Sequence, residues 1–339
     1  MARPADRLVT LAHGAGGKAT RALVEGLFLE ELGNPLLAPL GDSAVAAAPP
    51  GRLAFTTDAY VVKPLVFPGG DIGALAVHGT VNDLAVAGAR PLWLSAAFVI
   101  EEGFAIADLR RIARSMGEAA RAAGVAVVAG DTKVVERGKC DGLYVTTAGV
   151  GVLEHDLELT PAAVRPGDRI LVSGTLGDHG IAIMVARGGL DLEVVLESDT
   201  APVHELAAAL LRLGGRLRWM RDPTRGGLAT ALNELAAAAG LAVVLDESAL
   251  PVRPQVVGVC EILGIDPLYV ANEGKLVAVV APDAAEEGLA ALRAHPLGTN
   301  AALIGTIESE PAGLALLDTA FGGRRIVDML VGDPLPRIC

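Results

Sequence analysis

Apolar and polar residues alternate along the chain in two patterns, one typical of buried strands and one typical of amphipathic helices. Short apolar runs at 93–100, 125–131 and 143–153 predict buried strands. Residues 105–123 form the clearest helix, because apolar side chains recur there at helical spacing and Gly124 ends the pattern. Strand and helix patterns alternate through most of the chain, which predicts layered domains of α+β or α/β class.

The pattern changes near residues 160–168, TPAAVRPGD, and this change marks a domain boundary. The 339 residues are too many for one ordinary domain, and 52% of them are hydrophobic, enough for a core in each half. We therefore expect an N-terminal domain over 1–157 and a C-terminal α/β domain over 158–319. Residues 320–339, with Gly, Pro and charged residues, are expected to form a flexible tail.

Composition narrows the classes of partner. The formal net charge is -12, and such a surface repels phosphate backbones, so no nucleic-acid partner is expected. No apolar run reaches the roughly 18 residues of a membrane span and no signal peptide is recognisable, so we expect no membrane partner and a cytoplasmic location. The three cysteines lack metal-type spacing and are odd in number, which argues against a disulfide framework.

A glycine-rich turn, HGAGGKAT, follows the strand-like run LVTLAH. Gly14, Gly16 and Ala19 satisfy the G-x-G-x-x-A form of a dinucleotide fingerprint, but no acidic ribose ligand follows at the expected place. A P-loop is excluded because Ala12 stands where its first glycine is required. Two interpretations of this glycine-rich turn stay open: it is a mobile surface loop, or its backbone N–H groups close over phosphates.

Acidic residues recur where buried segments end or turn. They are Asp42, Asp58, Asp83, Asp131 and Asp222. Each one alone has an ordinary explanation as a helix or turn cap. Together, in an apolar setting, they suggest a site where Mg²⁺ bridges carboxylates to substrate phosphates.

Two polar turns add candidate site groups. In RDPTRGG, Asp222 or Thr224 could cap the following helix, whereas Arg225 beside two glycines could bind a phosphate. In NEGK, residues 272–275, the polar side chains precede a buried strand and form either a plain turn or part of a site.

The cysteine at position 339 is the most unusual feature, since an exposed thiol has no packing role there. Pro334 and Pro336 stiffen its approach. About twenty residues reach roughly 60 Å when extended, so Cys339 could move between a cleft and the surface. Such a thiol is typical of a carrier of a covalent intermediate.

These blocks resemble the HypE family of hydrogenase-maturation carbamoyl dehydratases. The resemblance runs nearly end to end through HGAGG, TTDAYVVKPLVFPGG, GDTKVV, GDHG, RDPTRGGLA, NEGK and RRIVDMLVGDPLPRIC. The family belongs to the aminoimidazole ribonucleotide synthetase superfamily, with selenophosphate synthetase and thiamine-phosphate kinase. The final PRIC is specific to HypE.

The resemblance implies a two-domain aminoimidazole ribonucleotide synthetase-like fold whose N-terminal sheet forms a barrel across a homodimer. It also implies that ATP and Mg²⁺ bind between the domains, with Asp58, Asp83 and Asp131 as metal ligands. The residues that match the family's nucleotide site are Gly14, Gly16, Gly17, Asp42, Asn82, Thr132, Asp222, Thr224 and Arg225.

The implied reaction is the ATP-dependent dehydration of a carbamoyl group on Cys339 to a thiocyanate, which supplies cyanide for the iron of [NiFe]-hydrogenase. The resemblance implies that the carbamoyltransferase HypF loads Cys339 and that a HypC–HypD complex receives the cyanide. Lys133 and Glu273 match residues near the incoming thiol. From their positions we expect Lys133 to stabilise oxyanion charge or relay a proton, and Glu273 to act as the general base. The alternatives are a kinase of a free small molecule, a non-catalytic nucleotide-binding scaffold and a dinucleotide oxidoreductase.

Overall fold

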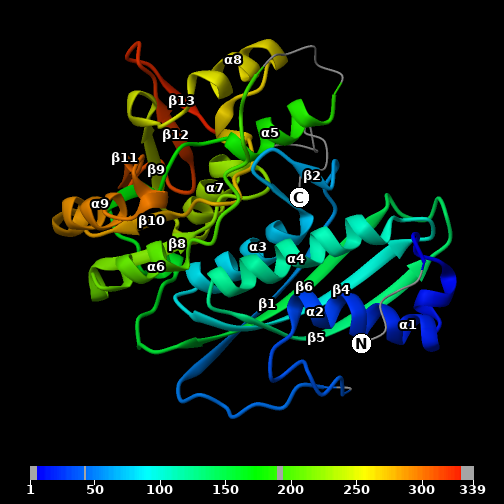
Figure 1. Cartoon of the computed structure of the whole chain (residues 1–339). Coiled ribbons are helices and arrows are strands. Elements are labelled where there is room, and N and C mark those ends of the chain that lie inside the picture. The colour runs from blue at the N-terminus through cyan, green and yellow to red at the C-terminus, as the bar shows by residue number, and fades with distance from the viewer. Residues whose placement is uncertain (1–5, 42, 189–193, 330–339) are drawn as a thin grey trace.

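Two β-sheets, one in each half of the chain, organise the fold (Figure 1). The structure is a computed structural model and describes residues 6–41, 43–188 and 194–329. Asp42 and Cys339, both predicted site residues, lie outside the described residues.

The first sheet has the strand order β1-β6-β4-β5. Its strands are β1 (Arg52–Tyr60), β4 (Arg90–Glu101), β5 (Ala126–Val135) and β6 (Leu143–Leu153). β4 and β5 run parallel and the other neighbours are antiparallel. A short hairpin of β2 (Val66–Phe67) and β3 (Gly70–Asp71) leads into α3. The parallel pair is connected by α4, which is the connection that parallel strands require.

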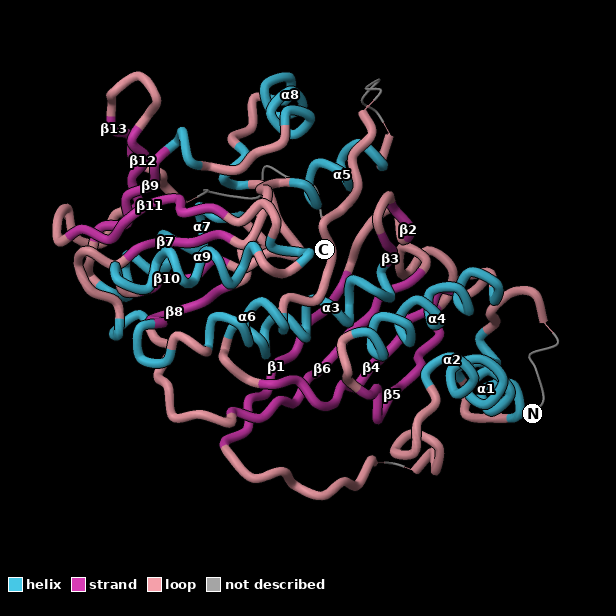
Figure 2. The backbone as a smooth tube through the Cα atoms, turned by 60° about the vertical axis from the view of Figure 1, so that its left-hand side comes forward, coloured by secondary structure: helices cyan, strands magenta, loops and turns pink. Residues whose placement is uncertain are grey.

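Helices cover one face of this sheet. α3 (Ile72–Val86) and α4 (Ile106–Ala122) lie across it, and the N-terminal segment with α1 (Lys18–Leu23), a π-helical turn (Val24–Phe28) and α2 (Leu29–Leu32) packs beside α4 (Figure 2). Phe28 and Phe98 meet there with ring centroids 4.7 Å apart. On the opposite face Leu53 and Phe55 are 58% and 72% exposed, so this open face of the sheet presents apolar side chains to its surroundings.

The second sheet has the order β13-β12-β9-β11-β7-β10-β8. Its strands are β7 (Arg169–Val172), β8 (Leu217–Arg221), β9 (Ala242–Asp246), β10 (Val277–Val280), β11 (Ala302–Glu308), β12 (Ala315–Asp318) and β13 (Arg324–Ile326). α7 (Gly227–Ala239) packs on one face, and α6 (His204–Leu211) and α9 (Ala285–Arg293) pack on the other. α5 (Asp178–Ala186) and α8 (Pro254–Leu263) form a smaller cluster with Cys260 in its core.

The end of the second sheet differs from the expected boundary at residue 320. β13 pairs with β12, Arg324 forms ion pairs with Asp318 and Glu308, and Val327 is fully buried. The first residues of the predicted tail, from 320 on, therefore form a tight turn between β12 and β13 and belong to the second sheet. None of the helices in the described residues is long and apolar enough to cross a lipid bilayer.

Asn82 on α3 joins the two halves. Its Nδ2 donates to the carbonyl oxygens of Ala201 (3.1 Å) and Glu273 (3.0 Å), and its Oδ1 accepts from the backbone N–H of Val203 (2.7 Å). The residue is 1% exposed. These three bonds cross from the first domain to the second, so a side chain predicted to contact nucleotide is engaged in holding the domains together. The predicted nucleotide contact stays a prediction.

Replacing Asn82 with Ala is expected to lower the free energy of unfolding by about 2 to 4 kcal/mol, because it leaves three buried backbone groups without partners. The substitution should also speed protease cleavage of the connection at 154–168. Asn34→Ala is the matched control, since Asn34 bonds only within the first domain, to Leu32, Leu36, Leu37 and Val127. Equal cleavage of both variants would show that Asn82 does not hold the junction.

Candidate functional site

A small pocket at the domain junction brings together six residues predicted from the sequence. Its lining, which we call the acidic pocket, consists of Asp58, Ala59, Tyr60, Gly79, Asp83, Asp222, Thr224, Arg225 and Glu273. The first five come from β1 and α3 of the first domain, and the last four come from two loops of the second. Residues separated by more than 200 positions thus share one site.

Asp58 is held from the first domain. It pairs in register with Thr147, which lies on the helix-covered face, and it accepts a hydrogen bond of 3.0 Å from the Tyr60 hydroxyl. The phenol fits because Gly79 has no side chain, and a Cβ there would overlap the Tyr60 hydroxyl. Burial, followed by the charge of Asp58, raises the pKa of Tyr60 well above its usual value. Tyr60 therefore remains a hydrogen-bond donor to Asp58.

Asp83 lies in the last turn of α3, where its Oδ2 accepts from the Thr56 hydroxyl of β1 at 2.7 Å. Burial raises the pKa of this carboxyl, the bond from Thr56 opposes the rise, and the nearby charge of Asp58 adds to it. Desolvation and repulsion by Asp58 therefore both oppose ionisation of Asp83 in the pocket.

Asp222 follows β8 and is 8% exposed. Burial and then the charge of Asp83 raise its pKa to about 7. The turn after it is fixed by Gly227, which has φ +61° and lies so close to the backbone of 268–270 that a Cβ would overlap it. Only glycine suits this combination of left-handed backbone and close approach.

Thr224 and Arg225, in the turn that leads into α7, line the acidic pocket. The N-cap residue is Gly226 and no side chain caps the helix. This contradicts the simpler explanation that Asp222 or Thr224 serves as the cap. Uncapped N–H groups at the start of a thirteen-residue helix, with a guanidinium beside them, form a favourable place for a phosphate.

Glu273, in the loop before β10, is 3% exposed, and both of its backbone polar groups are bonded to side chains. Asn272 beside it accepts from Gly177 N–H and donates to the carbonyl oxygens of Pro223 and Val270. The NEGK segment is thus a fixed structural element, which places the Glu273 side chain at the wall of the pocket.

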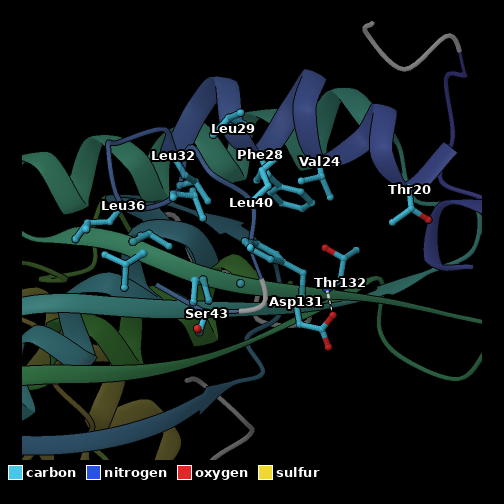
Figure 3. Close-up of a pocket in the computed structure, with 18 residues that line it drawn as sticks. Thr20, Val24, Phe28, Leu29, Leu32, Leu36, Leu40, Ser43, Asp131 and Thr132 are labelled. Atoms are coloured by element: carbon cyan, nitrogen blue, oxygen red, sulfur yellow. Dashed lines mark hydrogen bonds between the residues drawn. The ribbon is translucent and has the colours of Figure 1, made fainter. Parts of the chain in front are cut away.

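A second cavity, of about 240 Å³, lies between the N-terminal helices and the β4–β5 edge of the sheet (Figure 3). Its wall is mostly apolar, with Val24, Phe28, Leu32 and Phe98, and Thr20 and Thr132 at one end. The glycine loop borders the same end. Gly16 N–H donates to Thr20 Oγ1, and Gly14 lies so close to Val134 of β5 that a Cβ there would be 2.8 Å from its nitrogen.

Asp131 and Lys133 are not brought to the acidic pocket within this chain. They pair in register with Ala97 and Val99, which places them on the open face of the sheet, whereas Thr132 pairs with buried Phe98 on the helix-covered face. Figure 3 shows Asp131 and Thr132 on opposite sides of β5. Asp58 belongs to the other edge strand, so the predicted metal triad is split, and its assignment stays a prediction.

Oxygen ligands of the acidic pocket suit Mg²⁺, which takes one or two carboxylates and completes its shell with phosphates and water. Burial, with the charge of a neighbouring carboxylate added, raises the pKa of both Asp83 and Asp222, and a bound cation would offset both effects. The described residues contain no group of three or more His, Cys, Asp or Glu side chains arranged to hold a metal ion by themselves. Mg²⁺ ordinarily takes its remaining ligands from substrate phosphates and water.

The chain is similar to known protein families and to solved structures along nearly its whole length. Residues 40–153 and 165–315 match the N-terminal and C-terminal domain models of AIR synthase related protein. Carbamoyl dehydratase HypE of Bradyrhizobium diazoefficiens is 58% identical over 98% of this chain and 96% of its own length. A crystal structure of HypE in complex with ATP superposes with a TM-score of 0.93 at 46% identity, covering 97% of this chain and 99% of that one. HypE in a HypE–HypF complex gives 0.80 at 45% identity, covering 91% and 100%.

The raised pKa of Asp222 predicts a pH-dependent stability in protein free of nucleotide and divalent metal. The carboxyl has a pKa of about 7 when folded and near 3.8 when unfolded, so the stability from its protonated form is complete below pH about 4 and is lost as pH rises through 7. Asp222→Asn should therefore gain stability relative to wild type with rising pH, by about 3 kcal/mol between pH about 5 and pH about 8. Denaturant titrations at pH about 5 and 8 measure this, with exposed Asp283→Asn as the control. A stability difference between Asp222→Asn and wild type that is the same at both pH values contradicts the prediction.

Proposed function

Because the chain belongs to the HypE family of carbamoyl dehydratases among the AIR synthase related proteins, we propose that it uses ATP to convert an S-carbamoyl group on Cys339 into a thiocyanate. The observation that carries this proposal is the acidic pocket, where carboxylates of both domains share the lining with Thr224 and Arg225 of the turn that leads into α7. Phosphoryl transfer requires carboxylates that can hold Mg²⁺ and cationic groups that can bind the phosphates, and the pocket offers both kinds of side chain. The product would supply cyanide for the iron of [NiFe]-hydrogenase.

The proposed reaction has two stages. The carbamoyl oxygen attacks the γ-phosphorus of ATP and ADP leaves, which turns a poor leaving group into phosphate. The nitrogen then loses its two protons, the C–O bond breaks, and phosphate departs with that oxygen to leave S–C≡N. Bound Mg²⁺ would neutralise phosphate charge; Asp58 and Asp83 are the residues of the pocket placed to hold it.

The residues of the pocket divide these tasks. Arg225 and the start of α7 are placed to bind the transferring phosphoryl group. Glu273 is placed as the general base that removes protons from nitrogen, because it is a fixed carboxylate on the pocket wall. A bound cation would lower the free-energy cost of ionising Asp222, and the ionised carboxylate could then contribute to the metal or phosphate site.

We propose that the site is completed by a second copy of the chain. The open face of the first sheet carries exposed Leu53 and Phe55, and β1 and β5 are its two edges. A barrel in which β5 of one copy lies beside β1 of the other would bring Asp131 and Lys133 to the partner's acidic pocket. The apolar cavity, bordered by Thr132 and the glycine loop, would then receive the adenine ring.

Partners follow from the same proposal. One relative forms the HypE–HypF complex noted above, so we propose that HypF carbamoylates Cys339 of this chain. A HypC–HypD complex is the proposed acceptor of the cyanide.

Intact mass measures the function and its carrier together. After incubation with HypF, carbamoyl phosphate and ATP-Mg²⁺, wild type should carry a carbamoyl adduct that loses the mass of one water, and Cys339→Ala should carry none. Cys140→Ala is the matched control and should behave as wild type. An unmodified wild-type thiol in the presence of active HypF supports the alternative of a kinase for a free small molecule.

Mixed dimers test whether Lys133 and Glu273 act across copies. Lys133→Ala and Glu273→Gln should each lose most of the dehydration rate. Co-expressed in equal amounts, they form about half mixed dimers with one intact site each, so about a quarter of wild-type activity should return. No recovery of activity in the mixed dimers would show that the two residues act within one copy. Full activity of Glu273→Gln alone would show that Glu273 is not the general base.

A further inference from the structure

Residues 197–201, which we call the strap, run between the two domains beside the acidic pocket. Ser198 N–H donates to the Pro68 carbonyl oxygen at 2.8 Å, and a Cβ on Gly69 would come within 2.7 Å of the Ser198 oxygen. On the other side, a Cβ on Gly274 would overlap the carbonyl oxygen of Asp199. Glycines from both domains thus let the strap pass close to each backbone.

Side chains of the strap bond to both domains as well. Thr200 Oγ1 lies 3.0 Å from His78 Nδ1 on α3, and Ser198 Oγ lies 2.7 Å from His179 Nδ1 on α5. The strap therefore links α3 of the first domain to α5 of the second.

Asp199 is the member of the strap that reaches Glu273. Its Oδ1 accepts from the Glu273 backbone N–H at 3.1 Å, and its Oδ2 forms an ion pair with Lys275 Nζ at 3.2 Å. Both side chains are nearly inaccessible, with exposures of 2% for Asp199 and 10% for Lys275. Burial alone would raise the pKa of Asp199, but the adjacent Lys275 ammonium holds that pKa below its usual value.

The other backbone group of Glu273 is held from the first domain, since its carbonyl oxygen accepts from Asn82 Nδ2. The residue proposed as general base is therefore fixed at its nitrogen by Asp199 and at its oxygen by Asn82. This arrangement sets where the Glu273 carboxylate lies relative to Asp58 and Asp83, which are on the domain that carries Asn82.

We propose that Asp199 is a positioning residue for the dehydration, acting through its hydrogen bond to the Glu273 backbone N–H. The inference rests on the proposed function, in which Glu273 takes protons from the carbamoyl nitrogen. A small displacement of a catalytic group is enough to cost rate, by up to about a hundredfold for about 1 Å. Lys275 keeps Asp199 ionised and oriented, and its own stem packs over Gly174.

A matched pair of double variants isolates the hydrogen bond. Asp199→Asn with Lys275→Met keeps an oxygen acceptor for Glu273 N–H, and Asp199→Ala with Lys275→Met lacks one. Both remove the same ion pair, so neither leaves an unpaired buried charge. We expect kcat for dehydration of the HypF-loaded protein to fall about tenfold to a hundredfold only in the alanine pair. The KM for ATP should stay within about twofold in both, because Glu273 does not bind the nucleotide in this scheme.

Hydrogen exchange of the Glu273 amide gives a readout that needs no activity, and it should be faster in the alanine pair than in the asparagine pair. Equal kcat and equal exchange in the two pairs would overturn the inference. If the alanine pair does not fold, Asp199→Ser with Lys275→Met provides the same comparison, since the shorter hydroxyl leaves Glu273 N–H without its acceptor. If wild type fails to dehydrate, the proposed function is what fails, and the exchange rates still decide whether Asp199 holds Glu273.

Discussion

Carboxylates from two domains lie together in a largely buried pocket, and the desolvation and repulsion that they experience there connect the fold to the chemistry. Asp58 and Asp83 come from the first domain and Asp222 comes from the second. Burial and then the charge of Asp58 raise the pKa of Asp83, and burial and then the charge of Asp83 raise that of Asp222 to about 7. Folding alone gains nothing from such an arrangement. A cation with phosphates would remove the repulsion, so the pocket is suited to a charged ligand more than to its empty form.

The rest of the junction keeps the carboxylates in place against this cost. Tyr60 and Thr56 donate to two of them, and Asn82 and the strap bond the domains to each other. Gly79, Gly227 and Gly274 stand where a side chain would push these segments apart. Polar bonds that cross between domains therefore fix distances inside the site as well as the orientation of the two sheets.

Most of the strands and helices could be predicted from the sequence, because their apolar spacing is local information. The helix α4 falls within a residue of the predicted 105–123. The run LVTLAH contributes only an isolated bridge between Leu8 and Ala105 and a 3-10 turn, so its apolar residues did not indicate a strand. The strands β2, β3, β8, β12 and β13 were not predicted, since they are short and carry arginines or lie close to glycines.

The site was predicted in part. The turns containing Asp58, Asp83, Asp222 and Glu273 carried enough polar residues in apolar surroundings to be noticed, and the structure gathers them in one pocket. The roles of Asn82 and Asp199 could not be predicted from the sequence, because each acts through a contact far away in the chain. The face on which Asp131 lies follows from strand register, which a β-bulge in β4–β5 shifts and which spacing alone does not reveal.

The central claim is that ATP phosphorylates the carbamoyl oxygen, and following that oxygen tests it most directly. Cys339 would be loaded with a carbamoyl group whose carbonyl oxygen is a heavy isotope, and the inorganic phosphate released with ATP-Mg²⁺ would be analysed by mass spectrometry. The account predicts one heavy oxygen in each phosphate formed per thiocyanate. Heavy oxygen recovered in water, with unlabelled phosphate, would show that ATP is cleaved without activating the carbamoyl group and would contradict the account.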